Sequence, residues 1–424
     1  MNIAQLAILI VFILSYVFIL SEKVNRTVVA VLGAVLITLV GISLNIGTEY
    51  DAINMIDFNV IGLLFGMMII TATLSQTGFF AYVGVKVAQF FKGSLWRVFV
   101  SISVITAFVS MVIDNVTTVI LVTPIIVEIA KSIKVDPKPI LVGIAVLSNI
   151  GGVATMIGDP PNIMIASAAN LSFNSFIVYL MLPVILTIVA ALFIARVIFR
   201  GWAEGEGDVE WESIMAIDPS KKIRDYRQMK LVLLILAFTI FLFVMHDRLG
   251  ISSAYAAIIG GALSLLFNRK RPERVLYRVE WTTLIFFAGL FIIVGFVDKA
   301  GILNYVANAV GSISSNHEML ATFIILWLTA VLTAFVDNIP VTAVLIPVIK
   351  YIGSKNILWW ALALGVGFGG NATPIGSSAG VIVISLSHRF GYPISTREWF
   401  RYALPASAVS ILIATAYIYL LYII

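Results

Sequence analysis

Three carboxylates of this 424-residue chain fall inside long apolar segments, where a charged group needs a partner or a cavity. They are Asp114, Asp159 and Asp337. Because an ionised carboxylate is costly in hydrocarbon, such residues normally line a cavity and mark the path of an ion or a proton. All 27 lysines and arginines fall in loops or at the ends of apolar segments, so no basic partner is expected inside. We therefore expect these acids to be protonated, bound to a cation, or solvated by helix N-termini.

Asp114 and Asp337 share a pattern of neighbours, because each is followed by an amide and then by a hydroxyl. Carboxylate, amide and hydroxyl oxygens around a turn are hard ligands of the kind that sodium favours. The alternative is that each aspartate only caps a helix. The predicted ion- or proton-coupling residues are Asp114, Asn115, Thr117, Thr118, Asp337, Asn338 and Thr342, and the candidate sodium ligands among them are Asp114, Asn115, Asp337 and Asn338.

Asp159 precedes two prolines, which is the usual signature of a helix N-cap followed by proline in the first turn. It is expected either to cap this helix alone or to contact a substrate or ion as well. Glycine pairs nearby would let the backbone approach a ligand closely, and the N-termini of half-helices suit anions. The predicted substrate-binding residues are Ser148, Asn149, Gly151, Gly152, Thr155, Asp159, Asn162, Gly369, Gly370, Asn371, Thr373, Ser377 and Ser378.

The amino-acid composition indicates the class of protein to which these residues belong. Hydrophobic residues make up 61% of the chain and charged residues 12%, against roughly 45–50% and about 25% in soluble proteins. Many apolar runs are long enough to cross the hydrocarbon core of a bilayer. We therefore predict an all-α integral membrane protein of the cell membrane. The chain has no cysteine, which excludes disulfides, thiol catalysis and zinc–thiolate sites.

Four apolar segments are too long to be simple crossings. Segments 98–130 and 319–349 would each fold into two short arms, which favours re-entrant hairpins whose tips stop inside the membrane. Segments 139–170 and 356–386 are cut by glycines and prolines, so each is expected to be one crossing made of two half-helices. Together with the single spans this predicts ten crossings plus two hairpins. The single spans are 3–20, 27–45, 58–75, 175–198, 231–246, 251–267, 282–297 and 402–423.

The basic residues test this topology and give its orientation. With both termini outside, 23 lysines and arginines fall on the cytoplasmic side and four fall outside. This asymmetry is what the positive-inside rule requires. The charged stretch 201–228 is then a solvated cytoplasmic linker, with a regulatory or partner-binding loop as the alternative. It separates an N-terminal transporter repeat, 1–200, from a C-terminal repeat, 229–424.

The two repeats share their motifs at nearly constant spacing. Asp114-Asn115 matches Asp337-Asn338 at an offset of 223, and the glycine-rich stretch 151–158 matches 369–376 at an offset of 218. Because each half has five crossings, an odd number, the repeats must insert in opposite orientations. Inverted repeats with interrupted helices indicate a secondary transporter whose site lies at the repeat interface. A water channel or ion channel is the minor alternative.

The stretches 108–124 and 148–162 resemble the ion transporter superfamily, and the similarity covers almost the whole chain. This group contains the arsenite permeases, the P protein of melanosomes, NhaD-type sodium/proton antiporters, and citrate and dicarboxylate/sodium symporters. The motifs at 114–118, 148–162, 337–347 and 369–378 are closest to the P-protein and arsenite-permease-like branch. Where the dicarboxylate symporters carry Ser-Asn-Thr, this chain has Asp-Asn at both tips, which suggests a titratable site. The resemblance implies a homodimer that works by an elevator mechanism.

The function expected from these features is ion-coupled secondary active transport of a small ion. The substrate would be an anion or metalloid of the arsenite or carboxylate type, and the coupling ion H⁺ or Na⁺, with no other cofactor. The alternative is a sodium/proton antiporter, favoured by three internal acids without a base. A membrane enzyme is a third class, which the lack of thiols and of metal-ligand spacing disfavours. The expected partners are the substrate ion, the lipid bilayer and a second copy of the chain, but no nucleic acid.

Overall fold

The computed structural model describes residues 1–21, 24–205, 209–268, 272–305, 308, 318–352 and 356–423. Within these ranges every regular element is a helix, which confirms the all-α fold class. Of the basic residues that entered the count, five lie outside the described residues, namely Lys23, Arg269, Lys270, Arg271 and Lys355. Glu206 in the linker also lies outside them.

Most helices of the first half fall on the predicted apolar segments, whereas the helices at 49–54 and 79–90 lie between them. The segment 98–130 forms two helices separated at 111–114, and 139–170 forms two separated at 153–159. These helices are α1 (Ile3–Ser21), α2 (Arg26–Ser43), α3 (Glu49–Asn54), α4 (Phe58–Gln76), α5 (Phe79–Phe90), α6 (Leu95–Ser110), α7 (Asn115–Ser132), α8 (Lys138–Gly152), α9 (Pro160–Ala169) and α10 (Phe173–Ile198).

The second half follows the same order after the short linker elements α11 (Arg200–Glu204), α12 (Trp211–Met215) and η2 (Pro219–Lys222). Its long segments are interrupted at 336–337 and at 370–377. Its helices are α13 (Tyr226–Leu249), α14 (Ser253–Leu266), α15 (Pro272–Leu276), α16 (Trp281–Lys299), α18 (Glu318–Phe335), α19 (Asn338–Ile352), α20 (Asn356–Gly369), α21 (Ser378–Arg389) and α22 (Thr396–Ile423).

The interrupted regions make the same contacts in both halves. Thr155 donates a hydrogen bond to the carbonyl of Met111, and Thr373 donates to the carbonyl of Ala334. These pairs are related by the same offsets of 218 and 223 that the sequence motifs show. Each unwound stretch, 153–159 and 370–377, is therefore tied to the helix break of its own half. The opposite orientation of the repeats in the membrane stays a prediction.

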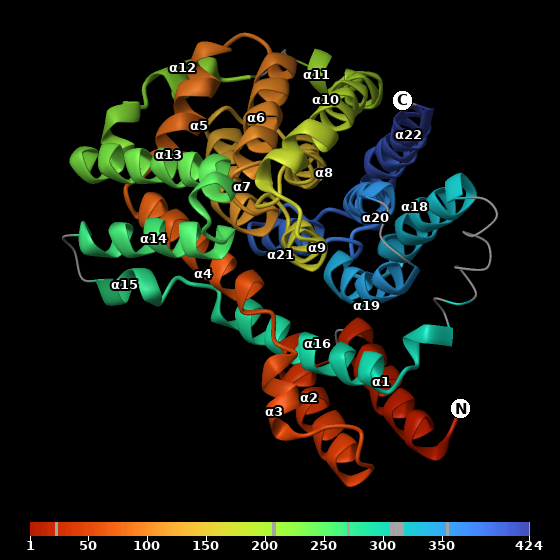
Figure 1. The fold of residues 1–424 in the computed structure, drawn as a ribbon. Coiled ribbons are helices and arrows are strands. Elements are labelled where there is room, and N and C mark those ends of the chain that lie inside the picture. Colours follow the sequence, from red (N-terminus) through yellow and green to blue (C-terminus); the bar gives the residue numbers. More distant parts are fainter. Residues whose placement is uncertain are drawn as a thin grey trace.

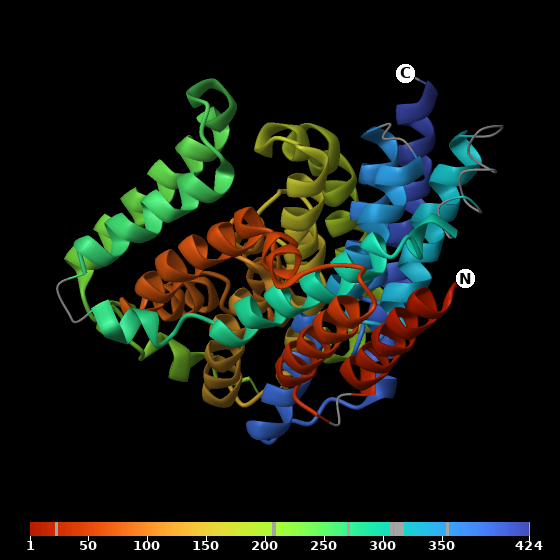
Figure 2. The ribbon, with the colours of Figure 1, turned by 60° about the horizontal axis from the view of Figure 1, so that its bottom comes forward.

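The helices pack in two groups that draw equally on both halves (Figure 1). The first group contains α1 to α4 and α13 to α16, with α2 packed on α16 and α4 packed on α14. The second group contains α6 to α10 and α18 to α22, with α6 packed on α8 and α18 packed on α20. The groups meet where α16 contacts α19, where α4 contacts α9 and where α13 contacts α10. Figure 2 shows α13 and α14 standing as a pair at the outer edge of the first group.

Eight of the described helices are long and apolar enough to cross a membrane, which fits a polytopic protein. They are α2, α4, α7, α10, α13, α16, α18 and α22. Two of these, α7 and α18, are arms of the predicted hairpins and have 18 residues each. At 1.5 Å per residue such an arm is about 27 Å long, which is close to the thickness of the hydrocarbon core. Arm length alone therefore does not establish the re-entrant hairpins, which stay a prediction.

The structure of the linker 201–228 and of residues 79–90 differs from what the sequence predicts. Residues 79–90 lie between the predicted segments 58–75 and 98–130 and form the amphipathic helix α5, on which the described part of the linker packs. Ile214 of the linker is fully buried, and the side chain of Gln89 donates to the carbonyls of Ile214 and Ile217. A hydrogen bond from Lys134 lowers the pKa of Glu210, also in the linker. The described linker is thus docked against α5 and α7 rather than only solvated.

Candidate ion- and substrate-binding site

The first tip, residues 111–118, and the second tip, residues 336–342, meet at the side chain of Asp159. The amide of Asn115 donates to Asp159 Oδ1 at 3.3 Å. The amide of Asn338 donates to the same oxygen at 3.3 Å and to Oδ2 at 3.1 Å. Asp159 is only 2% exposed and precedes α9. One carboxylate thus joins both tips to the start of a half-helix.

Asp159 occupies the N-cap position of α9, as its sequence context predicts, but its side chain makes no capping hydrogen bond. The interpretation of Asp159 as a cap alone is therefore wrong. Its counterpart Ser377 does cap α21, because its hydroxyl accepts from the amide of Gly380. The carboxylate of Asp159 is left to accept from the two tip asparagines instead.

A row of asparagines extends this contact across the two halves. Asn115 also donates to Asn149 Oδ1 at 2.9 Å, and Asn149 donates to Asn371 Oδ1 at 3.1 Å and to the Gly367 carbonyl at 2.8 Å. Asn115 is 2% exposed, and its Oδ1 finds no donor among the described residues. Since buried polar atoms are normally hydrogen-bonded, this acceptor marks a place where a ligand could bind.

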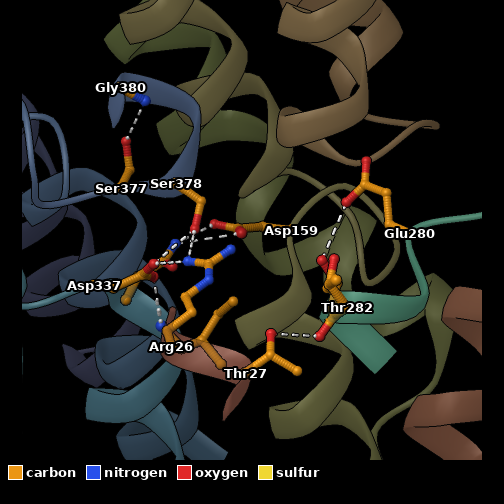
Figure 3. A network of polar contacts seen from close by, with 12 residues as sticks. Arg26, Thr27, Asp159, Glu280, Thr282, Asp337, Ser377, Ser378 and Gly380 are labelled. Carbon is orange, nitrogen blue, oxygen red and sulfur yellow. Dashed lines mark hydrogen bonds and ion pairs between the residues drawn. The ribbon is translucent and has the colours of Figure 1, made fainter. Parts of the chain in front are cut away.

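The two tip aspartates differ in their partners although their sequence contexts match. Asp114 caps α7 by accepting from the amide of Thr117 at 2.8 Å, and it is 8% exposed. Asp337 Oδ1 accepts from the amide of Ile339 at 3.2 Å. Its Oδ2 accepts from the hydroxyl of Ser378 at 2.6 Å and from Arg26 Nη1 at 2.8 Å (Figure 3).

The ion pair with Arg26 corrects the expectation that the internal acids have no basic partner. Arg26 is the first residue of α2, so its position at a helix end was predicted correctly. Its long side chain nevertheless reaches the second tip, where Nη1 also donates to Ser378 at 3.0 Å and the guanidinium lies 5.3 Å from the ring centre of Phe286. Arginine can extend its charge well beyond its backbone position in this way. A contact between residues 311 positions apart gives no signal in a single sequence.

Glu280 is a further carboxylate at the site; it lies just before the predicted span 282–297 and is not among the predicted site residues. It occupies the N-cap position of α16, makes no capping bond, and accepts from the hydroxyls of Thr117 and Thr283, each at 3.2 Å. With Thr117 it lines a cavity of about 210 Å³. Its repeat counterpart, Asp57, lies 223 residues earlier and caps α4, so extending the repeat comparison to helix starts would have found it.

Several predicted ligand residues instead hold the backbone of the site in place. Their side chains donate to main-chain carbonyls: Ser148 to Ala145, Asn162 to Gly152, Val153 and Thr155, Thr118 to Ile113, and Thr342 to Asn338. The threonines of the unwound stretches, Thr155 and Thr373, do the same. These residues fix the shape of the site, whereas the asparagines and aspartates present their side chains to one another.

The predicted glycine pairs serve helix packing. Gly151 lies against the backbone of Ala107 on α6, and Gly369 lies against Ala330 on α18, so closely that neither position leaves room for a Cβ atom. Gly152 and Gly370 face the backbone of the unwound stretch that follows each of them, with a Cβ position 2.6 and 2.8 Å from a carbonyl oxygen. Glycine is needed here for close approach of backbone to backbone.

Comparison with known proteins decides the family. The sequence model of a family described as "Citrate transporter" matches residues 16–365. This chain belongs to the citrate transporter family. An uncharacterized transporter of Mycobacterium tuberculosis is 36% identical over 97% of both chains, and a 46 kDa membrane protein of Mycobacterium leprae is 34% identical over 98% of both.

More distant similarities agree with this family. The P protein of Homo sapiens is 28% identical over 95% of this chain and 58% of its own length. The crystal structure of the YdaH transporter of Alcanivorax borkumensis has the same fold, with a TM-score of 0.60, 13% identity, and coverage of 89% and 88% of the two chains. These findings confirm the resemblance to the ion transporter superfamily. They indicate that this member of the citrate transporter family is a membrane transporter and not an enzyme.

Proposed function

We propose that this protein is an ion-coupled secondary active transporter that moves a small anion or metalloid, of the carboxylate or arsenite type. The observation that carries the proposal is the meeting of both tips at Asp159, because it brings polar groups of both repeats to one buried point. Sites of secondary transporters form in this way, at the interface of repeats with broken helices.

In this proposal the substrate binds among the amide groups beside Asp159, and the coupling ion binds at the tips. The amides of Asn115, Asn149, Asn338 and Asn371 can reorient to donate to an oxyanion or a hydroxyl. The N-termini of α9 and α21 add a positive dipole end. Asp114 and Asp337 supply the negative charge that a proton or a sodium ion requires. Binding of either species would then alter the contacts that hold the tips together.

The grouping of the helices supports an elevator mechanism. The second group, which carries both tips and both unwound stretches, meets the first group mainly through α16 with α19 and α4 with α9. We propose that the second group moves as a unit against the first, in a homodimer in the cell membrane. Both chain termini would lie outside and the linker 201–228 would lie in the cytoplasm, as the basic residues predict.

Purified protein in proteoliposomes tests this function. Radiolabelled arsenite, citrate and dicarboxylates are offered with an imposed proton gradient, with a sodium gradient, or with neither. We expect one substrate class to accumulate only when the matching gradient is present. Uptake that proceeds equally without any gradient would contradict ion coupling, and conductance far above transporter turnover in planar bilayers would indicate a channel.

A sodium/proton antiporter is the second candidate, favoured by the number of carboxylates. Asp114, Asp159, Asp337 and Glu280 are joined through the contacts of the tips, and Arg26 is the base bonded to them among the described residues. Such a cluster suits a cation as the transported species. Sodium-driven proton movement across liposomes, recorded with an internal pH dye and with no anion substrate present, would favour this candidate over the first.

A further inference from the structure

The two tips have equivalent sequences but unequal charge balance. The pair Arg26–Asp337 supplies a cationic partner at the second tip. At the first tip, Asp114 accepts from the amide of Thr117, and no lysine or arginine of the described ranges forms an ion pair with it. If both aspartates held a coupling ion, as their sequence symmetry suggests, they would be expected to have similar surroundings.

Both oxygens of Asp337 already receive donors. Oδ1 accepts from the amide of Ile339, and Oδ2 accepts from both Ser378 and Arg26. Arg26 Nη1 bonds Ser378 as well, so guanidinium, hydroxyl and carboxylate form a closed triangle at 2.6–3.0 Å. A carboxylate with this set of partners has its charge matched by a positive group within contact distance. A second cation at the same oxygens would be repelled by the guanidinium.

The sequence explains why the first tip cannot form the same triangle. Arg26 begins α2, and α14, the helix with the matching place in the second half, begins with Ser253; at the offset of 218 the counterpart of Ser378 is Pro160. Ser253 carries no positive charge, and the side chain of Pro160 has no hydrogen-bond donor. Beside Asp114, moreover, the buried Oδ1 of Asn115 is an acceptor without a donor among the described residues. The first tip therefore offers oxygens to a cation, whereas at the second tip the guanidinium of Arg26 already supplies the positive charge.

We propose that the Arg26 guanidinium takes the place of a coupling cation at the second tip, so that one monovalent cation, bound at Asp114, serves each transport cycle. This inference rests on the proposed ion-coupled function and specifies its stoichiometry. Arg26 belongs to α2 in the first helix group, and Asp337 belongs to the second group. The guanidinium of Arg26 can therefore pair with Asp337 only while the second tip lies beside α2.

The test measures the thermal stability of purified protein in detergent, with sodium chloride compared with choline chloride at equal ionic strength, and with acidification in choline chloride. No substrate is needed. In Arg26→Gln the vacated position should accept Na⁺ or a proton, so its Tm should rise more than that of the wild type. A bound ion at ten times its Kd should raise Tm by about 2 °C or more.

Two matched variants identify the source of this extra response. Arg26→Lys keeps the positive charge and should respond as the wild type does. Arg26→Gln combined with Asp337→Asn removes the unpaired carboxylate and should lose the extra rise. A response of Arg26→Gln equal to that of the wild type, or an extra rise that survives Asp337→Asn, would overturn the proposal. Either result can be obtained whether or not any substrate is transported, so it is distinct from failure of the proposed function.

A second comparison decides the question if Arg26→Gln does not yield folded protein. The wild-type rise in Tm with the cation should be lost in Asp114→Asn and kept in Asp337→Asn. Asparagine is a good N-cap, so Asp114→Asn can retain the bond from the amide of Thr117. Loss of the response in Asp337→Asn, alone or together with Asp114→Asn, would contradict a single cation at the first tip.

Discussion

At the scale of single residues, Asp159 receives amide donors from two asparagines that lie 223 positions apart in the sequence. The same asparagine of the first tip also bonds Asn149, which bonds Asn371 of the other half. These side chains form one connected network, in which the loss of a single partner leaves buried polar groups unsatisfied. Anything that binds at Asp159 must therefore affect both tips.

We predict that Asp159→Asn weakens both the fold and transport. The substitution places an NH₂ donor among the amide donors of Asn115 and Asn338 and removes the charge that strengthens their bonds. Loss of hydrogen bonds to a charged group should cost about 2 kcal/mol, and gradient-driven uptake should fall at least about tenfold. Asp57→Asn is the control, because Asp57 caps α4 and Asn can replace it there. Equal Tm and uptake for the two variants would show that Asp159 has no special role.

At the scale of the helices, the glycines explain how the broken helices fit against the hairpin arms. Gly151 brings α8 against α6, and Gly369 brings α20 against α18, in matching positions of the two halves. Thr155 and Thr373 then bond the unwound stretches to the helix breaks. The backbone at the site is thus held by close packing and by hydroxyl-to-carbonyl bonds, which leaves the asparagine and aspartate side chains to bind ligands.

The glycine contacts give a prediction for stability. In Gly151→Ala the new Cβ atom would overlap the backbone of Ala107, and since main-chain atoms cannot move aside easily, the helices must separate. We expect a loss of about 1–3 kcal/mol, as for other overpacked cores. Gly201→Ala is the matched control, because no atom lies within 4 Å of its added Cβ. Thermal unfolding in detergent measures both, and an unchanged Tm for Gly151→Ala would contradict the close packing of α8 on α6.

At the scale of the whole molecule, the sequence predicts the helical segments well and the contacts between them poorly. The apolar runs, the Asp-Asn tips and the glycine-rich breaks are local patterns, so their helices and interruptions could be located in advance. Three other features depend on contacts between distant segments. They are the ion pair of Arg26 with Asp337, the position of Glu280 beside Thr117, and the packing of the linker on α5. Such contacts leave no periodicity or motif in one sequence.

The topology prediction also belongs to the whole molecule. If the linker is cytoplasmic, a cysteine introduced by Glu206→Cys should not react with a membrane-impermeant maleimide in intact cells and should react after permeabilisation. Arg248→Cys, on the predicted outer side, is the control and should react in intact cells. The chain has no native cysteine, so labelling reports only the introduced site. Labelling of Glu206→Cys in intact cells would reverse the orientation.

Gradient-driven uptake by Asp114→Asn in proteoliposomes tests ion-coupled transport most directly. The variant keeps the size of the side chain and its capping acceptor but removes the charge that attracts the coupling ion. We predict that it loses accumulation against a gradient by about tenfold or more and retains exchange of the substrate between the two sides. In the absence of the coupling ion it should unfold at nearly the same temperature as the wild type. Accumulation equal to that of the wild type, with the same dependence on the imposed gradient, would contradict coupling through Asp114.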